Sequence, residues 1–122
     1  MSDTPRAFLL AGTPQTSTDY YTVTCPYDHQ VVGVVSRASA AQLDQAITAA
    51  TEAFAQTRAL PAHARARILR QVAQGIEAHA AEFARIIALE AGKPITQARA
   101  EVQRAMTTFL TAADECSQSH DE

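Results

Sequence analysis

The chain has 122 residues and a net charge of −3, with only 6% aromatic residues and no tryptophan. Its length allows one domain at most, and the scarcity of large side chains predicts a thin hydrophobic core. The weakly acidic balance gives no electrostatic reason to expect binding to nucleic acid or to an anionic membrane, and no apolar run is long enough to span a bilayer.

Two features bear on the cellular compartment. The chain has two cysteines, Cys25 and Cys116, which are too few for a disulfide scaffold and suit a reducing environment. The apolar run at residues 8–11 is too short to form the core of a signal peptide. The sequence therefore predicts a cytoplasmic protein.

The first part of the chain has the residue pattern of β-structure. Residues 1–19 are expected to form an N-terminal arm, in which Ala11 and Gly12 would turn the apolar run at 8–10 back on itself as a short ribbon. The β-branched and aromatic runs at 20–24 and 31–35 are separated by turn-forming residues that include proline and aspartate. This pattern predicts a β-hairpin.

After residue 37 the apolar spacing changes from two to about 3.6, which indicates helices. Ser39 followed by Gln42 is a capping-box signature, and Pro61 is suited to the first turn of a second helix. A bend or break is expected at Gly75 or in residues 79–81. We therefore expect the second helical region to consist of two segments.

A last helix is expected after a turn in which Gly92 ends one helix and Pro94 begins the next. The helix stripes are rich in alanine, so the rings of Phe54, Phe83 and Phe109 are expected to dominate the packing. The predicted fold class is mainly α with an N-terminal β-hairpin, and residues 20–122 would form one body.

Two cysteine–histidine pairs share one spacing, Cys25 with His29 and Cys116 with His120. Together they could form a Cys₂His₂ zinc site, and Cys25 with His29 could form a reactive ion pair. The alternative for each cysteine is inert packing, which we favour because one pair spans a proline turn and the other approaches the polar end of the chain. No residue is assigned a catalytic role.

Basic residues offer two further candidate sites. Arg65, Arg67 and Arg70 could bind phosphate, but their positions along a helix are more typical of a solvated face. Lys93 follows a glycine, as in a phosphate-binding loop, but the other glycines and the Ser/Thr of that motif are missing. A helix-capping turn is the better interpretation of Lys93.

Several motifs, in order, resemble the N-terminal segment of the aldehyde dehydrogenase superfamily. The hairpin resembles the pattern N-P-Y-D-G-E-V-V-G, and residues 38–54 resemble the first helix of that family. The other matching stretches resemble R-x-L-P-x-x-x-R-x-x-I-L, E-x-G-K-P and E-V-x-R-A, and lie at residues 58–69, 90–94 and 101–105. Cys25 and His29 depart from the pattern, where asparagine and glycine are commoner.

The resemblance implies an incomplete N-terminal piece of the family's α/β, Rossmann-like cofactor domain. Complete members are oxidoreductases that use NAD or NADP to convert an aldehyde to an acid through a catalytic cysteine. Those catalytic and nucleotide-binding residues would follow Glu122 in the family's order, so this chain is expected to be inactive and to bind no nucleotide alone. Its partner would be the remainder of the subunit, and the parent enzyme would be a homo-oligomer.

The resemblance also implies a structural site for a monovalent cation, formed by the backbone carbonyls of Val23 and Thr24 and the carboxylate of Glu90. An ordinary carboxylate at a helix end is the favoured alternative for Glu90. Two other interpretations of the whole chain stay open, a free-standing helical module that binds a protein partner and the remnant of a truncated gene.

Overall fold

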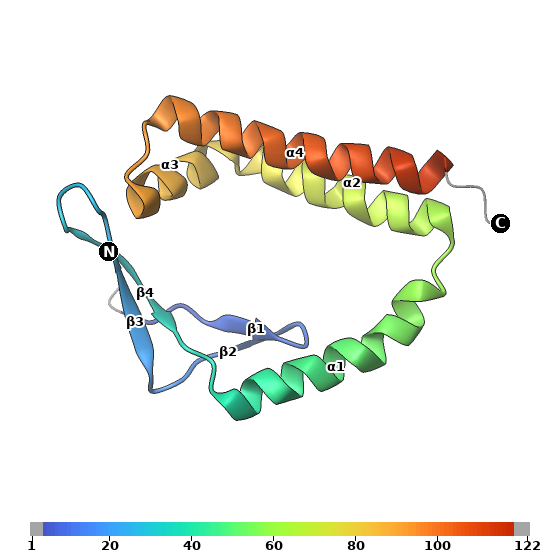
Figure 1. Cartoon of the computed structure of the whole chain (residues 1–122), viewed down its shortest axis with the longest axis horizontal. Coiled ribbons are helices and arrows are strands. Elements are labelled where there is room, and N and C mark those ends of the chain that lie inside the picture. Colours follow the sequence, from blue (N-terminus) through green and yellow to red (C-terminus); the bar gives the residue numbers. More distant parts are fainter. Residues whose placement is uncertain (1–3, 119–122) are drawn as a thin grey trace. The chain divides into compact units, whose positions relative to one another are not determined.

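The computed structural model describes residues 4–118, and the chain divides into two compact units, Met1–Ala59 and Leu60–Glu122 (Figure 1). Within the described residues, the first unit contains four short strands and one helix, and the second contains three helices. The expected division after residue 19 stays a prediction about domain organisation. None of the described helices is both long enough and apolar enough to cross a membrane.

The N-terminal ribbon consists of β1 (Phe8–Leu10) and β2 (Thr13–Gln15), which pair antiparallel. Ala11 and Gly12 form the two-residue turn between them, with φ of 50° and 79°. Positive φ at both central residues matches the twist of the flanking strands, which is why such turns favour glycine. The ribbon therefore forms at the position that the sequence predicts.

The hairpin consists of β3 (Tyr20–Thr24) and β4 (Val31–Ser36), also antiparallel. Its turn is closed by the backbone N–H of Cys25, which donates to the carbonyl of Gln30 at 2.9 Å. The Asp28 side chain accepts from the N–H of Gln30 at 3.1 Å, as expected for a turn aspartate. The predicted hairpin is confirmed.

Hydrogen bonds of Arg6, before β1, and of Gln15, in β2, hold the arm in place. The N–H of Arg6 donates to the carbonyl of Val34 at 2.8 Å, and the N–H of Ser36 donates to the carbonyl of Arg6 at 3.0 Å. The amide of Gln42 donates to the side chain of Gln15 at 3.3 Å. The arm is thus tied both to β4 and to the helix that follows it.

Helix α1 (Ala40–Arg58) begins at the predicted capping box. The N–H of Gln42 donates to the Ser39 hydroxyl at 3.2 Å, and the Gln42 side chain accepts from the N–H of Ser39 at 2.9 Å. These bonds satisfy N–H groups that a helix start otherwise leaves open. No residue of α1 is buried, so its apolar stripe is uncovered.

The second unit contains α2 (Ala62–Ala78), α3 (Ala80–Ala91) and α4 (Ile95–Gln118). The predicted break lies at His79, where the backbone leaves helical geometry, whereas Gly75 lies inside α2. Gly92 ends α3 with φ of 64°, and the carbonyl of Pro94 accepts from the first turn of α4. The predicted succession of helices is confirmed.

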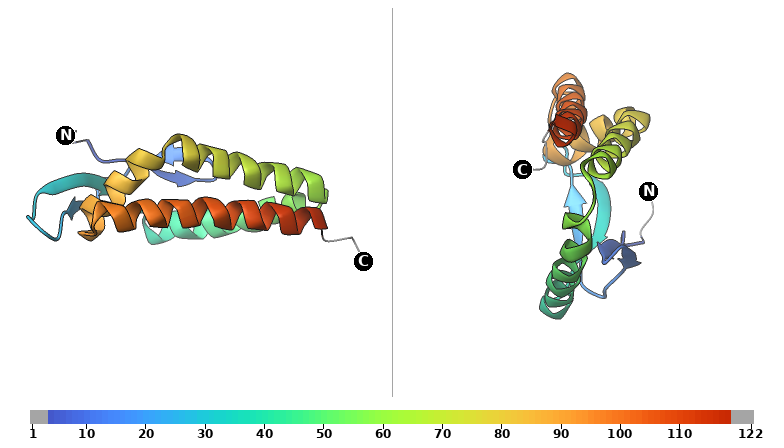
Figure 2. Two further views of the ribbon diagram at one scale, coloured as in Figure 1. Left: turned by 90° about the horizontal axis from the view of Figure 1, so that it is seen from above. Right: turned by 90° about the vertical axis from the view of Figure 1, so that its right-hand side faces the viewer.

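Helices α2 and α4 lie side by side in both Figures 1 and 2. Small side chains form the contacts among the three helices: Ala66 and Ala73 of α2, Ala84 of α3, and Ala98, Val102 and Ala113 of α4 are buried. The prediction that phenylalanine rings dominate the packing is wrong, because Phe54 is 62% exposed and Phe83 is 42% exposed. Alanine on the facing stripes of α2, α3 and α4 brings these helices close together. Phe54 lies on α1, in the first unit, and takes no part in this packing.

Candidate functional site

The predicted cation ligands lie in two separate units. Val23 and Thr24 belong to β3, where the register with β4 shifts: Val23 faces Gly33 and Thr24 faces Val31. Glu90 is an exposed residue in the last turn of α3. Two carbonyl oxygens and a carboxylate are chemically suited to a hard cation. Their meeting at one ion stays a prediction.

Cys25 is buried in the turn after β3, and both its N–H and its carbonyl are used in backbone hydrogen bonds. His29 lies at the other end of this turn, exposed, with φ of 60°. A buried thiol is poorly placed for reaction with a substrate. The structure thus gives Cys25 a packing role in the hairpin.

Cys116 is half-buried on α4, and its spacing partner His120 lies outside the described residues. Within residues 4–118 there is no group of three or more metal-ligating side chains close enough to hold an ion. The Cys₂His₂ alternative therefore has no support from the part of the chain that is described.

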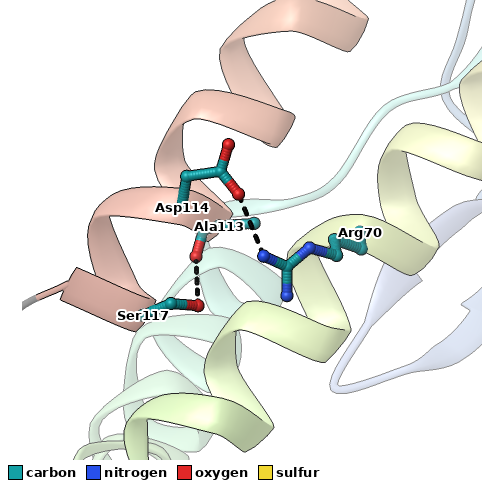
Figure 3. Close-up of polar contacts among 4 residues, drawn as sticks. All are labelled: Arg70, Ala113, Asp114 and Ser117. Carbon is teal, nitrogen blue, oxygen red and sulfur yellow. Dashed lines mark hydrogen bonds and ion pairs between the residues drawn. The ribbon is translucent and has the colours of Figure 1, made fainter.

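The arginines of α2 make contacts within the second unit. Arg70 donates to the carboxylate of Asp114 on α4 at 2.9 Å, next to the Ser117 hydroxyl, which donates to the carbonyl of Ala113 (Figure 3). Arg65 donates to the carbonyl of Leu60 at 2.7 Å, just before the helix begins. These contacts give two of the three arginines structural roles. The pair of Arg70 and Asp114 is exposed, so its contribution to stability is small.

Lys93 occupies the turn between α3 and α4 and donates to the carboxylate of Glu101, one helical turn and a half into α4. The guanidinium of Arg104 lies 3.8 Å from the same oxygen. The hydrogen bond from Lys93 lowers the pKa of Glu101, and the charges of Lys93 and Arg104 act in the same direction against a desolvation effect. Lys93 therefore fastens the turn between α3 and α4 to α4 through its side chain. The expected capping turn is formed by Gly92, which ends α3.

Substitution Glu101→Gln is expected to lower the stability of the second unit slightly at neutral pH. Because the folded state favours the carboxylate, its contribution is complete above the ordinary glutamate pKa of about 4.3 and disappears as the pH falls through the lower pKa of the folded state. Urea unfolding followed by circular dichroism would measure the difference at both ends of this range. If Glu101→Gln is still less stable than the wild type in acid, the charge of Glu101 does not explain the difference in stability. Glu77→Gln on α2 is the control.

An open groove of about 270 Å³ lies between the start of α3 and the first half of α4. Its lining is mostly apolar, with one arginine and one amide: Ala80, Ala81, Arg99, Val102, Gln103 and Met106. No acid, histidine, cysteine or hydroxyl group is among these side chains. The groove therefore offers neither a nucleophile nor a general base for catalysis.

The sequence profile of the aldehyde dehydrogenase family matches residues 13–122. The chain belongs to the aldehyde dehydrogenase family. An aldehyde-dehydrogenase-like protein of Sinorhizobium fredii is 39% identical over 97 residues, which are 80% of this chain and 19% of that protein. The predicted resemblance to the N-terminal segment of such enzymes is confirmed.

Solved aldehyde dehydrogenases share the fold. Aldehyde dehydrogenase 21 from Physcomitrella patens, in complex with the reaction product succinate, matches with a TM-score of 0.91 and 33% identity over 98% of this chain and 25% of that one. An NAD-dependent benzaldehyde dehydrogenase from Corynebacterium glutamicum matches with a TM-score of 0.88 and 28% identity over 96% and 26%. The mainly helical chain with its hairpin is thus a piece of the aldehyde dehydrogenase fold, and it spans about a fifth to a quarter of these relatives.

Proposed function

We propose that this chain is a non-catalytic segment of an NAD- or NADP-dependent aldehyde dehydrogenase, whose complete subunit oxidises an aldehyde to a carboxylic acid. The observation that carries the proposal is the family match over residues 13–122, combined with coverage of only 19–26% of the relatives. A match over nearly all of a short chain and a small part of long relatives is what one segment of a subunit would give.

The distribution of apolar side chains supports this proposal. Leu43, Ile47 and Phe54 of α1 and Ile68 and Val72 of α2 are exposed. An amphipathic helix gains stability by burying its apolar stripe, so such surfaces favour a covering partner. The remainder of the same subunit is the partner that the family membership suggests.

In the complete subunit, the bound nicotinamide nucleotide would accept a hydride from the substrate. No residue of this chain is proposed to touch the nucleotide or the aldehyde. Its helices would instead support the fold around them, through the alanine contact of α2 with α4 and the Lys93–Glu101 tie at the α3–α4 turn. This role is consistent with a groove lining that has no acid, base or nucleophile.

Three finer statements belong to the same proposal. Val23, Thr24 and Glu90 would contribute oxygen ligands to a structural monovalent cation. The complete enzyme would be a cytoplasmic homo-oligomer. The residues that select the aldehyde would lie in the remainder of the subunit.

The purified chain is expected to produce no NADH or NADPH when it is mixed with benzaldehyde or succinic semialdehyde and either nucleotide. The reason is that the chain lacks the nucleophile and the nucleotide site that the proposal places elsewhere in the subunit. The benzaldehyde dehydrogenase of Corynebacterium glutamicum is the positive control. Turnover that disappears in Cys25→Ala or Cys116→Ala would show a catalytic cysteine in this chain and would overturn the proposal.

A further inference from the structure

We draw no further inference here: the strongest candidate, the uncovered apolar stripe of α1 formed by Leu43, Ile47 and Phe54, carries no proposal of its own because nothing in the structure shows what covers it.

Discussion

Replacement of Ala98 by leucine is expected to lower the free energy of unfolding of the second unit by about 1–3 kcal/mol. Ala98 is 0% exposed and forms a buried cluster with Ala84 and Val102, where α3 meets α4. A larger side chain at this position has to push the helices apart or take a strained rotamer. Ile76 and Ile87 pack against the same cluster and would have to move as well.

The control for this substitution is Ala100→Leu, in the same helix but exposed. Leucine and alanine have similar helix propensities, so the two variants differ mainly in the burial of the new side chain. Urea unfolding curves, followed by the helical circular dichroism signal, give both free energies. Equal stability of Ala98→Leu and Ala100→Leu would contradict the tight packing of the buried cluster formed by Ala84, Ala98 and Val102.

The isolated chain is expected to bind a hydrophobic dye strongly and to self-associate as its concentration rises. The exposed apolar residues of α1 lie on one stripe at helical spacing, and contiguous apolar surface of this kind promotes association. Dye fluorescence and sedimentation velocity measure the two effects. A monomer that binds no dye and melts in one sharp transition would show that these surfaces are not interfaces.

Two variants test whether the dye binds to the apolar stripe of α1. The double substitution Leu43→Gln and Phe54→Gln is expected to reduce dye fluorescence several-fold, because it removes two of the large side chains of the stripe. Tyr27→Gln is the control, since Tyr27 is an exposed aromatic residue in the hairpin turn and does not belong to the stripe of α1. Equal losses in the two variants would place the dye elsewhere.

The elements of this fold could be predicted from sequence because their signals are local. The capping box at Ser39, the break near His79 and the left-handed Gly92 each depend on a few neighbouring residues. The core could not be predicted in the same way. A periodic stripe shows which face of a helix is apolar, but it does not show which stripe lies opposite. The buried residues are mostly alanines, whereas Phe54 and Phe83 are exposed.

Less of the candidate site than of the fold could be predicted from the sequence. The pairing of Lys93 with Glu101 was missed because the two residues are eight positions apart, beyond the i,i+4 spacing at which helical pairs are read from sequence. The cation ligands Val23, Thr24 and Glu90 come from the family resemblance, since backbone carbonyls have no sequence signature.

His29 departs from the family pattern at a position where the backbone has a positive φ. The family commonly has glycine at this position, and the structure holds His29 at φ of 60°. The hydrogen bonds of Cys25 with Gln30 and with His29 itself close the turn and impose this backbone geometry. Left-handed geometry is more costly for histidine than for glycine, so the hairpin turn contains local strain.

The most direct test of the central claim is the mass of the native protein that carries this sequence, captured from its source cells with an antibody against the chain and measured intact. If the chain is one segment of an aldehyde dehydrogenase subunit, the captured protein should be about four to five times heavier than the 13.1 kDa of these 122 residues, because the relatives are matched over only 19–26% of their length. A captured species of 13.1 kDa would contradict the claim and would favour a free-standing helical module.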